Sequence, residues 1–249
     1  MIRIEHDSAV ATITVADLAP LSNADTAFAL QLRDAVRDTA DDDGVKSIVL
    51  RAQGDDFARP ALARELAAAA TVRASRRAQW HAAYCAPSGL YQNLAYCKKV
   101  VVTAVRGHCG AVGSLLVLCS DHTVCSDDAE FEPPFATLPE SNLVLAALTT
   151  RLNRAKGWML GCDAWSADAA LRAGLVNRIV PTGDVDACAL EAARSAARMP
   201  LDGIAMSKLL FEAFLDTQGV GQDFDMAGFY ADSLNAAQQA AGQTAGDRK

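Results

Sequence analysis

The sequence has little that would place the protein outside a reducing compartment. Its 7 cysteines are odd in number and scattered, and none forms a C-x-x-C pair, so we expect neither a disulfide framework nor a zinc site. No apolar run reaches the length of a membrane-spanning helix. The first residues also lack the basic end and long apolar run of a signal peptide. These absences predict a cytoplasmic protein with no membrane span and no bound metal.

Basic charge is scarce as well. The chain carries 23 lysines and arginines against 30 acidic residues, which gives a formal net charge of -7 and a pI of about 5.1. This balance argues against nucleic acid as the main partner, although a local basic patch could still hold a phosphate. With 51% hydrophobic residues over 249 positions, the chain suits one large globular domain or a core with a helical appendage.

Strand patterns and helix patterns alternate along the chain, which predicts an α/β fold. Ile2–Ile4 and Val10–Val15 flank an Asp7-Ser8 turn and predict a hairpin. Capping signals at Ser22–Asp25, Ser141-Asn142 and Ser166 predict helix starts, the second of these for a helix that continues through Leu148 and Leu152. Further strands are expected at Val45–Leu50, Val100–Val105, from His122 and at Leu175–Val180, and further helices at Arg59–Ala83, Leu90–Tyr96, Val112–Cys119 and from Asp184 on.

The segment from Lys98 to Phe135 carries the clearest functional pattern. It has a buried strand, a glycine-punctuated turn, an apolar helix, a second strand and a proline-rich elbow. A strand that passes through a glycine-rich turn into a helix directs backbone N–H groups at one point. The pattern therefore predicts a site where main-chain donors converge.

Four segments in this chain closely resemble, in order and spacing, the enoyl-CoA hydratase/isomerase (crotonase) family. They are SNA at Ser22–Ala24, VKSIVLRAQGDDFARPA at Val45–Ala61, VVTAVRGHCGAVGSLLVLCSDHTVCSDDAEF at Val101–Phe131, and WSADAALRAGLVNRIVP at Trp165–Pro181. The resemblance runs from Ile2 to about Gly242. It implies a spiral of ββα units over residues 1–182 and a helical oligomerisation region over 183–249, and so a homotrimer or hexamer. Phe224, Phe229 and Tyr230 resemble the helix that packs in the family trimer.

The resemblance also implies a binding site for an acyl-CoA thioester, with coenzyme A as part of the ligand and no permanently bound cofactor. In the family, two backbone N–H groups hold the thioester carbonyl, and they correspond to Ala61 and Val112 here. Pro60 precedes the first donor, and Val112 replaces a glycine. Because a β-branched residue does not readily hold a positive φ, two alternatives stay open: a competent oxyanion hole and a narrowed one.

Both hydratase glutamates of the family are replaced in this sequence, by Leu115 and Phe135. Hydration requires one group that deprotonates water and another that protonates carbon, and neither replacement can transfer a proton. We therefore do not expect hydration by the family route. Glu140 is a candidate for the acid–base role, and the alternative is that it stabilises a helix N-terminus.

Other residues around the turn have both functional and structural interpretations. His108 and Gly110 could line the thioester pocket, although a packed histidine is the simpler interpretation of the first. Cys109 has no evident base beside it and Glu132 is expected to be solvated, so neither is a favoured catalytic residue. Basic residues could contact the phosphates of coenzyme A or form a solvated face: Arg59, Arg64, Lys98 and Lys99.

Three functions follow as alternatives. The first is an acyl-CoA enzyme, a lyase or isomerase by family, that stabilises an enolate with non-standard acid–base residues. The second is a non-catalytic acyl-CoA binder or accessory subunit, in which Leu115 and Phe135 form an apolar floor for an acyl chain. The third is a protein that keeps only the fold and its oligomer contacts.

Overall fold

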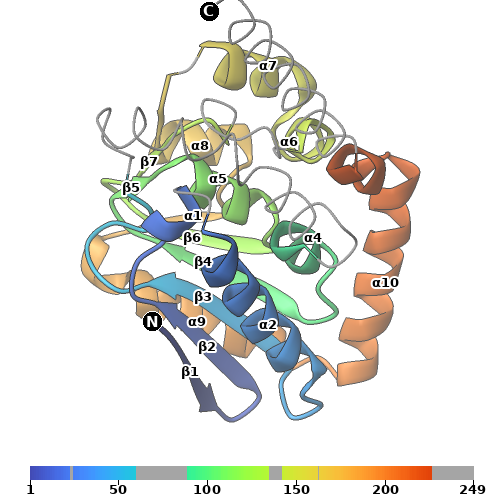
Figure 1. The fold of residues 1–249 in the computed structure, drawn as a ribbon. Helices are drawn as coiled ribbons and strands as arrows, with labels where there is room; N and C mark the ends of the chain where they lie inside the picture. Colours follow the sequence, from blue (N-terminus) through green and yellow to red (C-terminus); the bar gives the residue numbers. More distant parts are fainter. Residues whose placement is uncertain (23–24, 60–88, 135–141, 162, 226–249) are drawn as a thin grey trace, which may run out of the picture.

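The computed structural model describes residues 1–22, 25–59, 89–134, 142–161 and 163–225, and this part contains two β-sheets (Figure 1). The larger sheet has the strand order β1-β2-β3-β4-β6-β9 and the smaller the order β5-β7-β8. β1 is antiparallel to β2, and every other pairing in the larger sheet is parallel. The larger sheet comprises β1 (Ile2–Asp7), β2 (Val10–Val15), β3 (Ser47–Ala52), β4 (Val100–Val105), β6 (His122–Ser126) and β9 (Arg178–Val180), and the smaller comprises β5 (His108–Cys109), β7 (Glu130–Phe131) and β8 (Trp165–Ser166).

Helices cover both faces of the larger sheet and one of its sides (Figure 1). One face carries α9, and the opposite face carries α2, α4 and α5, while α10 runs along the side. None of the described helices is long and apolar enough to cross a membrane. Their bounds are α1 (Ala19–Ser22), α2 (Thr26–Asp41), α4 (Leu90–Ala95), α5 (Ala111–Leu118), α6 (Leu143–Thr150), α7 (Leu152–Gly161), α8 (Ala167–Ala173), α9 (Val185–Ala196) and α10 (Leu201–Thr217).

The central strands β2, β3, β4 and β6 are buried on both faces, which explains why their sequences are largely apolar, whereas the edge strand β1 is exposed. In β4, Val101 and Val105 belong to the core that packs against α2, α4 and α5. The alternate residues Val102 and Ala104 face the other way and join Val185 of α9 in a second core. This packing fixes the direction of β4 and therefore the place where the glycine-rich turn leaves the sheet.

The structure confirms the α/β fold class and most of the predicted elements. The opening hairpin is present, and Asp25 caps α2 by accepting a hydrogen bond from the N–H of Phe28 at 3.1 Å. Asn142 caps α6 in the same way, and its buried side chain also donates to the carbonyl oxygen of Val220 at 2.9 Å. Local capping signals were sufficient for these helix starts because each cap contacts an N–H three residues further along the chain.

Two predicted elements are wrong in extent. The helix expected to run from Ser141 through Leu152 ends at Thr150, because Arg151 has a φ of 70° and α7 then begins at Leu152. The strand expected at Leu175–Val180 is limited to Arg178–Val180. The helix predicted at Arg59–Ala83 lies, after Arg59, outside the described residues.

Candidate functional site

The candidate site is the turn that joins β4 to α5. β4 ends at Val105, and Gly107 then takes a φ of 52°, a conformation that L side chains rarely adopt. A Cβ atom on Gly107 would lie 2.4 Å from the carbonyl oxygen of Asp55, so the turn also needs glycine for space. The chain continues through β5 to Gly110, the N-cap of α5. The sharp turn therefore depends on the absence of a side chain at Gly107.

The loop after β3 is joined to this turn by three backbone hydrogen bonds. The N–H of Phe57 donates to the carbonyl oxygen of Arg106 at 2.8 Å, and the N–H of Ala58 to that of His108 at 2.9 Å. In return, the N–H of Gly110 donates to the carbonyl oxygen of Ala58 at 2.7 Å. The loop residues 57–59 thus run beside the turn. Ala61, the other expected donor, follows this loop by two residues and lies outside the described residues.

Gly110 and Gly113 allow the loop to approach α5 this closely. A Cβ atom on Gly110 would lie 3.0 Å from the carbonyl oxygen of Ala58. One on Gly113 would lie 2.9 Å from both the Cβ of Ala58 and the Sγ of Cys109. A Cβ contact of 2.9 Å is essentially never found and one of 3.0 Å is unusually tight, so a larger residue at Gly113, and to a lesser degree at Gly110, would push the loop away from the helix.

Val112 occupies a regular helical position at the start of α5. In the described part of the chain, the non-glycine residues with a positive φ are Ser8 and Arg151. Val112 therefore does not have the strained positive φ that its replacement of a glycine raised as an alternative. The N–H of Ser114 makes the first helical bond, to the carbonyl oxygen of Gly110 at 2.9 Å. Within the described residues, the preceding N–H groups of Ala111, Val112 and Gly113 have no acceptor. Val112 is only 1% exposed, so its N–H, which has no acceptor among the described residues, is a buried donor at a helix N-terminus.

The side chains that follow on α5 carry no proton-transfer group where the family has a glutamate. Leu115 is fully buried and belongs to the main core. The neighbouring Ser114 is also buried, and its hydroxyl donates to the carbonyl oxygen of Cys109 at 3.2 Å. Phe135 and Glu140 lie outside the described residues. The turn therefore offers backbone hydrogen-bond donors, but position 115 on α5 supplies neither an acid nor a base.

Cys109 does not have the surroundings of a nucleophile. Its side chain is buried beneath the turn, and this burial raises the pKa of the thiol well above its usual range. A nucleophilic cysteine needs a lowered pKa and a nearby cation or base. The structure therefore supports the interpretation of Cys109 as a packing residue.

His108 and Arg59 lie on the exposed side of the turn. The His108 side chain is exposed, and its Nδ1 is 3.5 Å from a carboxylate oxygen of Glu130. The prediction of a packed histidine is therefore wrong. The Arg59 side chain is 75% exposed, and its Nε lies 3.3 Å from a carboxylate oxygen of Asp56. Asp56 also accepts the backbone N–H of His108 at 3.0 Å. These four polar residues, Asp56, Arg59, His108 and Glu130, form a rim beside the turn, and Arg59 is the cation of this rim.

Lys98 and Lys99 lie at the opposite end of β4, and their predicted place beside the turn is wrong. The Lys98 ammonium is 2.7 Å from a carboxylate oxygen of Asp41. Lys99 is buried, and its ammonium donates to the carbonyl oxygen of Asp42 at 3.0 Å. Both residues precede the strand, whereas the turn follows it. Arg64, the fourth predicted cation, lies outside the described residues.

One polar cluster that supports the turn was not predicted. Asp186 at the start of α9 accepts hydrogen bonds from Arg51 at 2.8 Å and from Arg106 at 2.7 Å. Arg106 directly precedes Gly107, so this ion pair anchors the residue from which the turn departs. Arg106 lies 80 residues and Arg51 lies 135 residues from Asp186 in the sequence, and no local pattern indicates such contacts.

Comparisons with known proteins identify relatives at the level of sequence and fold. The family model for enoyl-CoA hydratase/isomerase matches residues 5–241. The 4-chlorobenzoyl coenzyme A dehalogenases 1 and 2 of Arthrobacter sp are each 26% identical over 214 residues, which cover 84% of this chain and 77% of each relative.

Solved structures share the fold over most of the chain. An enoyl-CoA hydratase/isomerase from Xanthobacter autotrophicus Py2 is 25% identical with a TM-score of 0.67, covering 92% of this chain and 85% of its own. A structure from Acinetobacter baumannii, assigned as an enoyl-CoA hydratase/isomerase, has a TM-score of 0.74 at 22% identity and covers 91% and 92% of the two chains.

Proposed function

This chain belongs to the enoyl-CoA hydratase/isomerase family, and we propose that it binds acyl-CoA thioesters and polarises their carbonyl group with the backbone N–H groups of Val112 and Ala61. The observation that carries this proposal is the buried N–H of Val112 at the start of α5, for which the described part of the chain offers no acceptor. The loop bonded to the turn leads directly to Ala61. Coenzyme A is a part of the ligand here, and Gly110, His108, Arg59 and Arg64 belong to the proposed binding site.

The chemistry of such a site is the stabilisation of an enolate. A thioester oxygen gains negative charge when the α-carbon loses a proton or the β-carbon is attacked. Donors that are fixed in advance stabilise that charge, and each contributes about 3 kcal/mol to the transition state. Glu140 is our proposed acid–base residue, since neither Leu115 nor Phe135 can transfer a proton. The dehalogenase relatives are named for 4-chlorobenzoyl coenzyme A, also a thioester, which supports thioester chemistry other than hydration.

A non-catalytic acyl-CoA binder or accessory subunit is the second candidate function. The fully buried Leu115 favours it, because the family's acid position is here part of the apolar core. Product analysis over a panel of acyl-CoA thioesters, with Glu140→Gln as the paired variant, separates the two functions. Turnover that the substitution abolishes supports the enzyme, and the absence of any turnover alongside tight binding supports the binder.

Charge reversal at Arg59 is expected to weaken acyl-CoA binding by about tenfold, because the phosphates lose a cation and gain a repelling carboxylate. The exposed Arg59 side chain has room to turn from Asp56 towards a phosphate. Fluorescence polarisation of a labelled acyl-CoA at constant salt measures the effect. Arg3→Glu on the exposed β1 strand is the matched control and should bind like the wild type. Equal dissociation constants for the two variants would remove Arg59 from the site, and no binding by the wild type would overturn the function itself.

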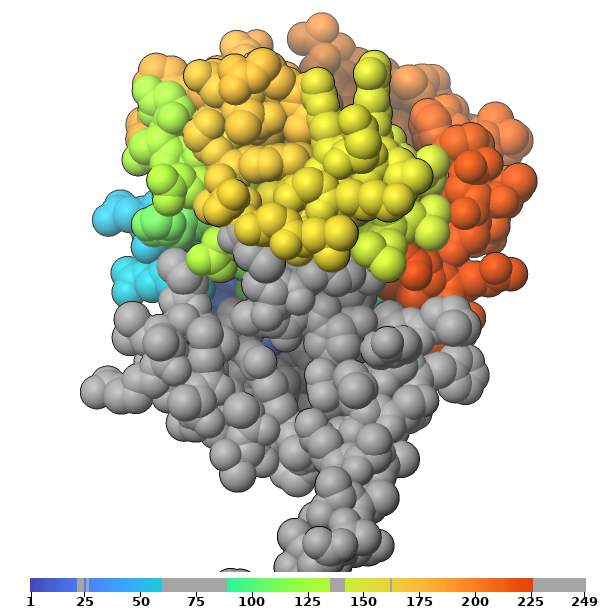
Figure 2. All heavy atoms as spheres, turned by 90° about the horizontal axis from the view of Figure 1, so that it is seen from above, coloured from blue at the N-terminus to red at the C-terminus, as the bar shows by residue number. Residues whose placement is uncertain are grey.

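We also propose that the chain assembles as a homotrimer or hexamer through α10. Large apolar side chains are exposed along this helix, which forms one side of the molecule beside the yellow α6 and α7 (Figure 2): Met206, Leu209, Leu210, Phe211 and Phe214. Patches of this kind mark protein interfaces. Phe224 is buried within the same chain, whereas Phe229 and Tyr230 lie outside the described residues. Light scattering at micromolar concentration should give three or six copies, and a monomer would exclude the assembly.

A reducing cytoplasm is our proposal for the location. Five cysteines in the described residues have free thiols: Cys97, Cys109, Cys119, Cys125 and Cys188. All of them except Cys188 are buried. Buried, unpaired thiols are typical of reducing compartments. Recovery of the protein from a secreted fraction would contradict this location.

A further inference from the structure

Asp186, the second residue of α9, holds two arginines that come from different strands of the larger sheet. One carboxylate oxygen accepts a hydrogen bond from Arg51 at 2.8 Å, and the other accepts one from Arg106 at 2.7 Å. The three side chains are between 24% and 32% exposed, so water screens their charges only in part. A carboxylate that binds two guanidinium groups in this way is a firm contact between the elements that carry them.

The two arginines lie where both halves of the proposed thioester site leave the sheet. Arg51 is the last residue but one of β3, and the loop towards Ala61 follows that strand. Arg106 comes directly after β4, where the turn towards Val112 begins. β3 and β4 are adjacent and parallel. Asp186 thus joins the ends of the two strands from which the two proposed donors follow.

Arg106 also connects the turn with the loop through its backbone. Its carbonyl oxygen accepts the N–H of Phe57 at 2.8 Å, and the next residue, Gly107, donates its N–H to the hydroxyl of Ser126 at 3.2 Å. A movement of Arg106 would therefore shift the loop and the turn together. Main-chain donors act on a developing oxyanion from about 2.7–3.1 Å, so a small displacement removes much of their effect.

Arg106 depends on Asp186 more than Arg51 does. The Nε of Arg51 also donates to the hydroxyl of Thr14 at 3.0 Å, and a carboxylate oxygen of Glu5 lies 3.7 Å from its guanidinium. Among the residues that the structure describes, Arg106 has no carboxylate other than that of Asp186 within 4.0 Å. If the shared carboxylate were removed, the two guanidinium groups would repel each other, and Arg106 would be the one that moves.

The position of α9 does not depend on this carboxylate. Three apolar side chains of the helix, Val185, Ala189 and Ala193, are fully buried in the second core. The hydroxyl of Ser47 also donates to the carbonyl oxygen of Ala193 at 2.9 Å. A purely structural alternative is that Asp186 stabilises the first turn of α9, where a negative charge is favourable. That alternative predicts a change in stability and no change at a bound thioester.

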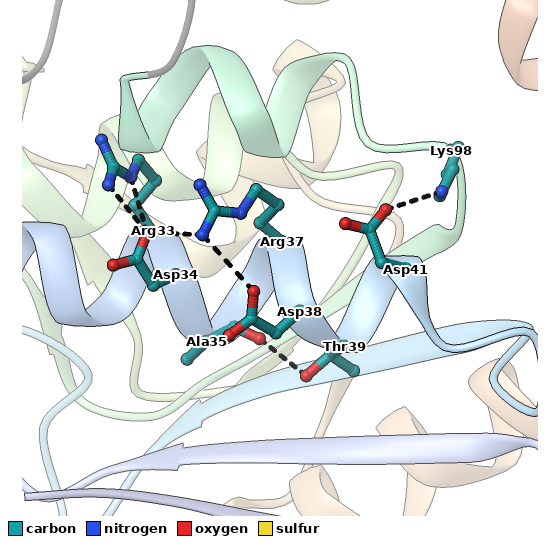
Figure 3. A network of polar contacts seen from close by, with 8 residues as sticks. All are labelled: Arg33, Asp34, Ala35, Arg37, Asp38, Thr39, Asp41 and Lys98. Carbon is teal, nitrogen blue, oxygen red and sulfur yellow. Dashed lines mark hydrogen bonds and ion pairs between the residues drawn. The ribbon is translucent and has the colours of Figure 1, made fainter.

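A comparable cluster on α2 provides a matched control. Asp34 also binds two arginines, Arg33 at 2.7 Å and Arg37 at 3.3 Å (Figure 3). All three residues lie on one helix, so this cluster joins neither strand ends nor loops. Removing its carboxylate changes the net charge by the same amount and leaves the contacts of Arg106 in place.

We propose that Asp186 is a positioning residue for the thioester site, which holds Arg106 and thereby sets where the backbone donors lie. Asp186 acts through Arg106 and the hydrogen bond to Phe57, and it does not itself contact the ligand. This role rests on the proposed function, because it requires a thioester carbonyl at the N–H of Val112.

Isotope-edited infrared spectroscopy of the full chain with butyryl-CoA, labelled with carbon-13 at the thioester carbonyl, tests this role. Hydrogen bonds lower the stretching frequency of a carbonyl group, so the downshift on binding measures its polarisation without any turnover. We expect a downshift in the wild type, about half of it or less in Asp186→Asn, and all of it in Asp34→Asn. Arg106→Gln should lose as much as Asp186→Asn, and the double variant no more than either.

The possible failures are distinguishable. A downshift in the wild type that Asp186→Asn leaves unchanged would overturn the positioning role while the proposed function stands, and a lower thermal midpoint with it would assign Asp186 to the stability of α9 alone. A bound thioester without any downshift in the wild type would overturn the proposed function, and this role with it. Arg106→Gln leaves α9 unaltered, so it decides the question if Asp186→Asn does not fold.

Discussion

Replacing Gly107 with alanine is expected to lower the free energy of unfolding by about 3 kcal/mol or more. An alanine would have to hold a φ of 52°, and its Cβ would lie 2.4 Å from the carbonyl oxygen of Asp55 and 2.5 Å from a carboxylate oxygen of Asp56. The loop cannot easily yield, because Phe57 and Ala58 are hydrogen-bonded to the turn. Urea unfolding followed by circular dichroism measures the loss.

Gly157→Ala is the matched control for this substitution. Gly157 lies within α7, and a Cβ atom there would meet nothing within 4 Å. Because alanine has the higher helix propensity, we expect this change to stabilise the protein by up to about 1 kcal/mol. A Gly107→Ala variant as stable as Gly157→Ala would contradict the geometry described for the turn.

Crotonyl-CoA is expected to be hydrated at least about 10⁴-fold more slowly than by a family hydratase that has both glutamates. A positioned acid or base contributes about 10²- to 10⁴-fold to a reaction rate, and this chain lacks both at the family positions. Leu115 is fully buried, so water has no access to its side chain. The loss of the enoyl thioester absorbance measures the rate.

Two controls make a negative result informative. A hydratase with both glutamates verifies the assay, and a binding measurement with the same thioester shows that the site is occupied. Hydration at the rate of that enzyme would contradict the claim that Leu115 and Phe135 have ended this chemistry.

The elements that could be predicted from the sequence are those fixed by local contacts. Strand runs such as Val100–Val105 are buried on both faces, so their apolar sequences are continuous. Caps such as Asp25 and Asn142 act on an N–H three residues away, within reach of a sequence pattern. The order of four family-like segments then gave the spiral fold and the glycine-rich turn of the site.

The errors arose where conformation or distant contacts decide the structure. The apolar pattern continues across Arg151, so nothing in it shows that this residue takes a positive φ and ends α6. The strain considered for Val112 assumed a positive φ that the structure does not contain. His108 and its strand partner Glu130 on β7 lie on the exposed face of the small sheet, whereas the next residue of β5, Cys109, is buried, and this assignment of faces depends on the register of the sheet.

The misplacement of Lys98 and Lys99 has a different cause. They are close in sequence to the turn, but β4 separates them from it by its whole length. At that end, the Lys98 ammonium pairs with the Asp41 carboxylate and the Lys99 ammonium donates to the backbone carbonyl oxygen of Asp42. Proximity in sequence was therefore a poor guide to proximity in space, and Arg59, which follows β3, remains the one of the four predicted cations that the structure describes beside the turn.

The most direct test of the account is a crystal structure of the protein with bound butyryl-CoA. The account predicts that the thioester oxygen accepts hydrogen bonds from the N–H groups of Val112 and Ala61 at about 3 Å. It also predicts that the phosphates of coenzyme A lie near Arg59. A thioester carbonyl directed away from Val112, or a turn whose N–H groups are covered by the protein's own side chains, would contradict it.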